Sequence, residues 1–179
     1  MHPDLARALE LADLAASFAL PRFRALDLRV ETKPDLTPVT ETDRTVERAL
    51  REALDGEAVL GEEEGGPGPG GRRWIVDPID GTKNYSRGIP AWFTLIALEV
   101  DGEVEVGVAA APALGRRWWA VRGEGAFADG DPIRVSRVGR VEEAGGRATD
   151  FTGVPGVERG SLVSSNGVLH DEVLRLLAR

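Results

Sequence analysis

The chain has 179 residues, of which 42% are hydrophobic, and this is enough for one sizeable core with or without a smaller appended domain. Its 30 acidic residues outnumber its 22 basic ones, for a formal net charge of −8, and no basic run interleaved with aromatic residues is present, which argues against a nucleic-acid-binding surface. The sequence has no cysteine and only two histidines, so disulfides and thiolate metal sites are excluded and any bound metal is expected to have oxygen ligands.

The sequence gives no indication of a membrane protein. No stretch approaches the roughly 18 consecutive apolar residues of a membrane-spanning helix. The first segment, MHPDLARALELADLAA, is charged and amphipathic rather than typical of a secretory signal. We therefore predict a cytoplasmic protein that binds neither nucleic acid nor membranes.

Two amphipathic helices are predicted before residue 56. Pro21 is expected to end or kink the first, whose apolar residues recur at helical spacing. In the second, within TPVTETDRTVERALREALDG, Thr40 or Thr42 can cap the start and Gly56 is expected to stop the helix. The apolar stripes are Leu5, Leu9, Ala12, Ala16 and Ala19 in the first helix and Val46, Leu50 and Leu54 in the second.

After the second helix the pattern changes to that of strands. AVLG at 58–61 predicts a short buried strand that leads into three glutamates, and the glycine-proline run at 65–71 predicts a flexible loop. RRWIVD at 72–77 predicts a second strand that ends at Asp77.

Further strands are predicted in the next 60 residues. TLIALEVDGEVEVGVAAAP at 94–112 is typical of a hairpin with its turn at Asp101-Gly102, and RRWWAVRGEGAFADGDPIRVS at 116–136 indicates more strands and turns. Helices followed by hairpin-linked strands predict an α+β fold with a largely antiparallel sheet.

The segment WIVDPIDGTKNY at 74–85 carries the candidate chemistry. Asp77 and Asp80 are expected to meet Glu62, which follows the neighbouring strand, and such carboxylates raise one another's pKa unless a cation lies among them. Magnesium fits a few carboxylates combined with water and substrate phosphate, and Gly81 and Thr82 could present backbone amides to an anion. The alternative is that an isolated D-P-x-D only caps a turn.

Three motifs occur together: TETD ending at Asp43, GEE at 61–63 and DPIDGT at 77–82. In this order and approximate spacing, they make the chain closely resemble the inositol monophosphatase family of magnesium-dependent, lithium-sensitive phosphatases. The resemblance implies a layered αβαβα sugar-phosphatase-like fold, in which helices flank an antiparallel-rich sheet.

The resemblance also implies roles for individual residues. Glu62, Asp77 and the carbonyl of Ile79 would bind a first metal ion, Asp77 and Asp80 a second, and two or three Mg²⁺ ions are expected. The implied catalytic residues are Thr82, which orients the attacking water, with its partner Asp43, and Glu62. The implied substrate-binding residues are Asp80, Gly81 and Thr82.

Other charged residues nearby have weaker assignments. Glu63 and Glu64 are interpreted as a solvated charge run. Lys33 aligns with a lysine near the metal site in relatives, and a surface role is an equal alternative.

The flanking segments DLTPVTETDRTVE, RGIPAWFTLIAL and APALGRRWWAVRGEGAFADGDPIRVS most resemble the histidinol-phosphatase branch. An inositol-1-monophosphatase with broad sugar-phosphate specificity is the alternative. A small phosphorylated substrate and a homodimer are implied in either case. Trp118 and Trp119 are assigned no site role, because a tryptophan pair in a strand is more often half core and half surface.

The C-terminal part departs from the family pattern. Family members carry a Trp-Asp pair in a second α/β domain, whereas none of the four tryptophans here is followed by aspartate. EEAGGRATDFTG at 142–153 and SLVSSNGVLHDEVLRLL at 161–177 still resemble the family's C-terminal end.

We therefore predict an N-terminal domain at 1–138 and a remnant of the second domain at 139–179, with an internal stretch missing near Arg137 to Val141. Such a loss is expected to weaken the second metal site and to leave an exposed sheet edge or apolar face. A degenerate, non-catalytic family member that binds metal or an anion is the second functional hypothesis.

Overall fold

The computed structural model describes residues 2–33, 36–68, 70–134, 147–149 and 163–165, together with Asp171 and Arg175. These residues belong to two compact units, Met1–Ile133 and Arg134–Arg179. The predicted boundary between residues 138 and 139, and the expected seam at Arg137 to Val141, lie outside the described residues.

In the second unit, strand β10 (Arg147–Thr149) pairs antiparallel with strand β11 (Val163–Ser165). The rest of the two C-terminal segments singled out by the sequence lies outside the described residues, apart from Asp171 and Arg175.

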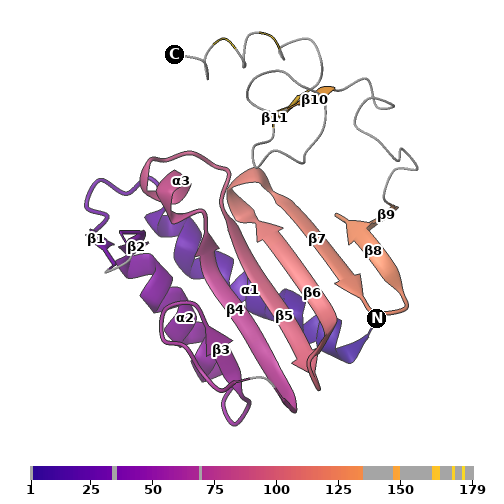
Figure 1. Cartoon of the computed structure of the whole chain (residues 1–179). Coiled ribbons are helices and arrows are strands. Elements are labelled where there is room, and N and C mark those ends of the chain that lie inside the picture. The colour runs from indigo at the N-terminus through magenta and orange to yellow at the C-terminus, as the bar shows by residue number, and fades with distance from the viewer. Residues whose placement is uncertain are drawn as a thin grey trace. The chain divides into compact units, whose positions relative to one another are not determined.

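The first unit is built on a seven-stranded sheet in the order β3-β4-β5-β6-β7-β8-β9 (Figure 1). Only the β3–β4 pair is parallel, and every other neighbouring pair is antiparallel. The strands are β3 (Val59–Gly61), β4 (Arg72–Asp80), β5 (Phe93–Val100), β6 (Glu103–Ala111), β7 (Arg116–Val121), β8 (Gly125–Ala128) and β9 (Asp131–Ile133). The predicted α+β class and antiparallel-rich sheet are confirmed.

Helix α1 (Pro3–Arg22) and helix α2 (Glu41–Ala53) cover one face of this sheet (Figure 1). The buried face of α1 differs slightly from the predicted stripe, since Leu9 and Ala16 are only partly buried, and the helix runs one residue past Pro21. The buried residues of α1 are Leu5, Ala8, Leu11, Ala12, Ala15 and Ala19.

Helix α2 follows its prediction closely. Thr40 caps it through a capping box in which its side chain accepts from the Asp43 amide and the Asp43 side chain accepts from the Thr40 amide. Val46, Leu50 and Leu54 are buried, and Gly56 follows the helix with a φ of +81°. A short antiparallel ribbon of β1 (Val30–Thr32) and β2 (Pro38–Thr40) precedes the helix.

The hairpin between β5 and β6 confirms the predicted turn, because Asp101 and Gly102 both have positive φ, as a type I′ turn requires.

The prediction that the strand before this hairpin, β4, ends at Asp77 is wrong. Strand β4 continues to Asp80 through an irregularity between Asp77 and Asp80, and pairing resumes where Asp80 lies opposite Phe93. Proline, which has no N–H to donate to a strand ladder, is accommodated at this irregularity, and its carbonyl accepts a hydrogen bond from the Thr94 hydroxyl at 2.9 Å.

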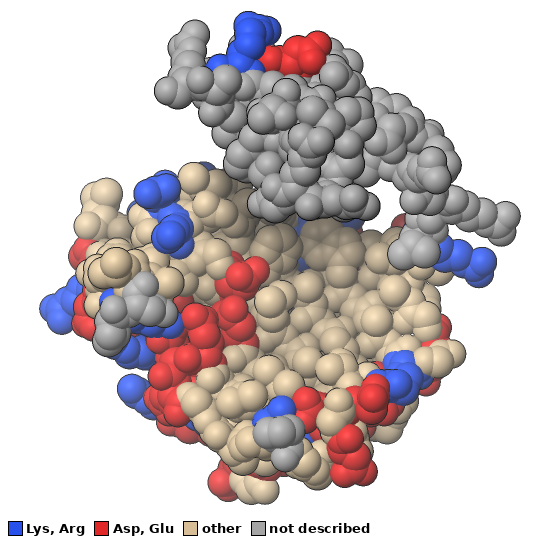
Figure 2. All heavy atoms as spheres, viewed as in Figure 1, with Lys and Arg blue, Asp and Glu red and all other residues tan. Residues whose placement is uncertain are grey.

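The other face of the sheet is apolar, and no helix among the described residues of the first unit covers it (Figure 1). It holds an open hollow of about 730 Å³, and Figure 2 shows an uncharged, hollowed area bordered by acidic side chains. The larger side chains in the lining are Leu60, Ile75, Leu95, Ile96, Trp118, Trp119, Phe127 and Ile133. On this face Leu95 and Ile133 are 36% and 44% exposed. In the described part of the chain, no helix is long and apolar enough to cross a membrane.

Candidate metal and phosphate site

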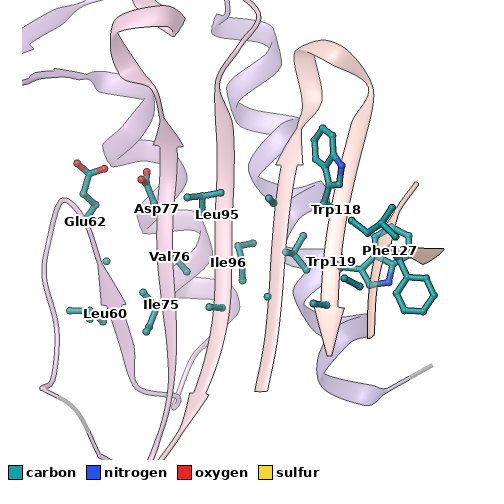
Figure 3. Close-up of a pocket in the computed structure, with 18 residues that line it drawn as sticks. Leu60, Glu62, Ile75, Val76, Asp77, Leu95, Ile96, Trp118, Trp119 and Phe127 are labelled. Carbon is teal, nitrogen blue, oxygen red and sulfur yellow. The ribbon is translucent and has the colours of Figure 1, made fainter. Parts of the chain in front are cut away.

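Glu62 and Asp77 are brought together by the single parallel pair of the sheet. Gly61 of β3 lies opposite Val76 of β4, so the residues that follow them are at the same end of adjacent strands. Figure 3 shows both carboxylates at this end, directed away from Leu60, Ile75 and Val76, which precede them along the strands. The Glu62 amide also donates to the Val76 carbonyl at 3.2 Å, which extends the pairing to the site itself.

Asp77 carries the most perturbed carboxyl of the site. Burial, followed by the neighbouring Glu62 and Asp80 carboxyls, raises its pKa to about 7. Its Oδ1 accepts a hydrogen bond from the Ile79 amide at 3.1 Å, which favours the ionised form but does not offset the other causes. The negative charge around Asp77 is therefore not fully compensated by the protein.

The third predicted ligand, Asp80, is at the exposed end of β4. Among the described residues, no three acidic or histidine side chains lie close enough together to hold a metal ion. Glu62 instead lies 3.0 Å from the Lys33 ammonium. The predicted convergence of three carboxylates is thus formed only in part, by Glu62 and Asp77, with Asp80 acting on Asp77 through its charge.

The donors present are suited to a hard divalent cation. All three acidic side chains offer oxygen, and their mutual repulsion at Asp77 is the kind that a cation relieves. Mg²⁺ commonly takes one or two carboxylates and keeps several waters, so two adjacent carboxylates suffice for it where a calcium cage would need more ligands.

Thr82 and Asp43 are hydrogen bonded, as the resemblance implied. Thr82 Oγ1 lies 3.1 Å from Asp43 Oδ1 and 3.0 Å from the Ile79 carbonyl oxygen. Thr82 begins the five-residue helix α3 (Thr82–Ser86), and Gly81 before it has a φ of +88°. A side chain at Gly81 would be strained by that φ and would lie 3.3 Å from the Ala91 carbonyl oxygen.

Asp43 is fully buried at the start of α2. Burial raises the pKa of its carboxyl, while hydrogen bonds from Thr40 and Thr82 act against that rise. Its Oδ2 accepts from the Thr40 amide at 2.9 Å and from the Thr40 hydroxyl at 2.5 Å. The side chain is therefore held rigidly, with Oδ1 directed to Thr82.

The interpretation of Glu63 as a solvated charge is wrong. Its side chain is 7% exposed and lies 2.6 Å from the Lys33 ammonium. Burial raises the pKa of Glu63, and Lys33 acts against that rise. Burial lowers the pKa of Lys33, but hydrogen bonds to Glu63 and Glu62 outweigh it and raise that pKa. Lys33 thus belongs to the acidic cluster, whereas Glu64 is largely exposed and lies 3.4 Å from Arg51.

One residue of this region was not predicted from the sequence. Glu47 is fully buried, and its carboxylate accepts hydrogen bonds from the backbone amides of Glu63 and Glu64. The available signal was its position four residues after Asp43, on the same face of α2.

Trp118 and Trp119 line the same open hollow as Glu62 and Asp77, on the far side of the sheet from the two carboxylates along the strand order (Figure 3). Trp119 stacks on Phe127 with ring centroids 5.9 Å apart, and Trp118 contacts Phe93 at 6.1 Å.

Comparisons with known proteins identify the same family as the sequence motifs. The model of the inositol monophosphatase family matches residues 1–142. The histidinol-phosphatase of Mycobacterium tuberculosis is 42% identical over 255 residues, covering 98% of this chain and 98% of that protein. The histidinol-phosphatase of Streptomyces coelicolor is 49% identical over 154 residues, which cover 79% of this chain but 58% of that protein.

The lengths agree with a missing internal stretch. The match to the Mycobacterium protein spans 255 residues, whereas this chain has 179, so at least 76 positions of that relative have no counterpart here. The match to the Streptomyces protein leaves more than a third of that relative uncovered.

Solved structures show the same fold. An IMPase of Thermotoga maritima superposes with a TM-score of 0.69 at 27% identity, covering 98% of this chain and 96% of that one. An inositol monophosphatase of Anabaena superposes with a TM-score of 0.63 at 21% identity, covering 98% and 95%.

Proposed function

This chain belongs to the inositol monophosphatase family, and from that premise we propose that it is a magnesium-dependent phosphomonoesterase that releases inorganic phosphate from histidinol phosphate. The observation that carries the proposal is that one short segment, 77–82, joins the two parts such a reaction needs. Asp77 pairs with Glu62 at one end of the segment, and Thr82 pairs with Asp43 at the other.

The carboxylate part would hold the cation. Glu62, Asp77 and Asp80 would bind Mg²⁺ through carboxylate oxygens, and Ile79 through its carbonyl. When bound, Mg²⁺ lowers the pKa of coordinated water and neutralises charge on the transferring phosphoryl group. We propose two or three ions, and the charge excess at Asp77 supports at least one.

The Thr82–Asp43 pair would position the nucleophile. If the Thr82 hydroxyl donates its single proton towards Asp43 and the Ile79 carbonyl, its lone pairs can accept a hydrogen bond from a water molecule. The water oxygen then bonds to phosphorus as the ester P–O bond breaks in line, and the departing alcohol leaves with a proton. Asp80, Gly81 and Thr82 would contact the phosphate, and no covalent phosphoenzyme is needed.

The choice of ester rests on the relatives. The named histidinol-phosphatases share 42% and 49% identity with this chain, and a role in histidine biosynthesis would follow from that substrate. An inositol-1-monophosphatase with broad sugar-phosphate specificity is the second candidate, favoured by the likeness to the Thermotoga IMPase. Lithium sensitivity, cytoplasmic location and a homodimer remain predictions, and the apolar sheet face supports the last of them.

A non-catalytic family member is the candidate from another class. The observation that favours it is the lack of at least 76 positions found in the Mycobacterium relative, together with the lack of any Trp-Asp pair. Such a chain would keep the Glu62–Asp77 pair and bind metal without turning over substrate.

One assay separates these candidates. Phosphate release by the 179-residue chain, verified by intact mass, is measured with histidinol phosphate and with inositol 1-phosphate, in Mg²⁺ and in chelator. Chelator-sensitive turnover that is faster with histidinol phosphate and abolished by Asp77→Asn is the expected result. Faster turnover of inositol 1-phosphate would support the second candidate. A folded chain that binds Mg²⁺ and releases no phosphate from either ester would support the non-catalytic one.

A further inference from the structure

Glu47 is a buried charged residue that the proposed chemistry does not use. It lies on α2 with its side chain fully buried. Its Oε2 accepts from the Glu63 amide at 2.8 Å, and its Oε1 accepts from the Glu64 amide at 3.1 Å. A buried carboxylate that accepts from two consecutive backbone amides fixes the path of that turn, because both hydrogen bonds go to a charged acceptor that has no access to water.

Gly61 shows how closely the turn passes over this carboxylate. A Cβ atom at Gly61 would lie 1.9 Å from Glu47 Oε1, which no side chain could tolerate without displacing the glutamate. Gly61 immediately precedes Glu62, so the contact lies directly beside the proposed metal ligand.

Arg51 completes the arrangement one helical turn further along α2. Its Nη2 lies 2.6 Å from Glu47 Oε1, and its guanidinium also donates to the carbonyls of Val59 at 3.2 Å and Gly65 at 2.5 Å. The Glu47–Arg51 pair therefore holds the turn in its middle and at both ends. Because Arg51 compensates the Glu47 charge, the buried carboxylate needs no metal of its own.

Helix α2 connects this turn to the Thr82–Asp43 pair. Asp43 and Glu47 are four residues apart on one buried face of the helix. Asp43 accepts from Thr82, whereas Glu47 accepts from the amides that follow Glu62. One rigid helix thus sets the positions of the nucleophile-orienting residue and of the turn that carries a proposed metal ligand.

We propose that Glu47 is a positioning residue that holds the 62–64 turn so that Glu62 stays beside Asp77, and that it thereby sets the affinity of the site for a divalent cation. The inference rests on the proposed function, since it concerns the same metal site. A purely structural role would lower the stability of the chain without changing metal affinity in the folded protein.

The test compares Glu47→Gln with the wild type and with Glu52→Gln, a matched change on the exposed side of α2. Glutamine keeps the size of the side chain but has one acceptor oxygen, so one turn amide would face an NH₂ group. The readouts are Mn²⁺ affinity by titration calorimetry, the Mg²⁺ dependence of phosphate release, and thermal stability in chelator.

Glu47→Gln is expected to weaken Mn²⁺ binding about 10- to 100-fold and to raise the half-saturating Mg²⁺ concentration similarly, as for other residues that orient metal ligands. Saturating Mg²⁺ should restore most of kcat. Glu52→Gln should match the wild type. A lower melting temperature with unchanged Mn²⁺ affinity would overturn the inference. A wild-type chain that binds no Mn²⁺ and releases no phosphate would instead overturn the proposed function on which it rests.

Gly61→Ala provides an independent test if Glu47→Gln does not fold. The added methyl group displaces the glutamate without removing its charge, so the same loss of Mn²⁺ affinity is expected. Where Glu47→Gln does fold, the loss of Mn²⁺ binding free energy in the double variant should be smaller than the sum of the losses in the two single variants, because both changes act through one contact. Full additivity, or a Gly61→Ala chain with wild-type Mn²⁺ affinity, would contradict the inference.

Discussion

Thr82 Oγ1 lies 3.1 Å from Asp43 Oδ1, and this hydrogen bond joins the start of helix α3 to the start of helix α2. Asp43 is itself held by the Thr40 amide and hydroxyl, so the acceptor is fixed before any ligand binds. A hydroxyl with one proton and two nearby acceptors cannot turn freely, and its lone pairs point in a defined direction. Such a group is preorganised to bind water.

The first prediction concerns this hydroxyl. Thr82→Ala should lower kcat about 100-fold at saturating Mg²⁺ and leave metal affinity nearly unchanged, because the group orients water and is not a carboxylate ligand. Thr82→Ser should keep most of the activity. Thr45→Ala is the matched control, since Thr45 is an exposed threonine that donates to the Glu41 carbonyl at 2.8 Å. Equal losses in Thr82→Ala and Thr82→Ser would show that the hydroxyl is not the functional group.

The second prediction concerns pH and Asp77. Its pKa is about 7 in the folded chain against an ordinary value of 3.8, so the folded state binds more protons between these values. The free energy of unfolding of the metal-free chain should therefore fall as the pH rises through this window. Asp43 and Glu63, whose pKa values are also raised, add to the same slope. Melting temperatures in chelator across this pH range measure the effect.

Asp77→Asn measures how much of this pH dependence of the free energy of unfolding comes from Asp77. The variant should lose part of the pH dependence and should be at least as stable as the wild type without metal at pH 8. It should also lose the stabilisation by millimolar Mg²⁺, because that stabilisation requires preferential binding to the folded state. The assignment of Asp77 fails if the variant keeps both the wild-type slope and the Mg²⁺ effect.

Much of this fold could be predicted from local patterns. The cap at Thr40, the apolar stripe of α2 and the turn at Asp101-Gly102 depend on a few adjacent residues, and all three were confirmed. The end of β4 was misplaced because the pattern D-P-x-D resembles a turn. Pairing with Phe93 of the next strand, β5, keeps Asp80 in the sheet, and a local pattern at 77–80 does not show that pairing.

The site was predictable as a set of motifs but not as a set of contacts. The Thr82–Asp43 hydrogen bond was implied by the family resemblance, and the meeting of Glu62 with Asp77 followed from adjacent strand ends. The buried positions of Glu63 and Glu47 were not predicted, because in a run of charged residues the sequence does not show which side chain turns inward. That depends on how α2 packs behind the sheet.

The third prediction concerns Lys33, whose ammonium contacts Glu62 at 3.0 Å and Glu63 at 2.6 Å. Lys33→Met should destabilise the metal-free chain by about 1–3 kcal/mol, because the buried Glu63 carboxylate and the half-exposed Glu62 carboxylate lose their cation. Stabilisation by Mg²⁺ should increase, since the remaining negative charge is then compensated by metal alone. Lys83→Met on α3 is the matched control, as Lys83 is exposed. Melting temperatures that change equally in the two variants, with and without Mg²⁺, would contradict the assignment.

The fourth prediction concerns the apolar face of the sheet. Leu95 and Ile133 line it and are 36% and 44% exposed, so the face should bind a hydrophobic fluorescent dye and promote self-association. Changing both residues to threonine should remove much of the dye fluorescence and shift the chain towards monomer in light scattering, while threonine maintains the strands.

Val30→Thr is the control for that experiment, because Val30 is 49% exposed on β1 and does not line the hollow. It should leave dye binding and oligomeric state unchanged, which would show that the position of the apolar side chains matters and not their number. A wild-type chain that binds no dye and remains monomeric at high concentration would show that the face is covered in solution. A homodimer would then need a different interface, and the sheet face would no longer support it.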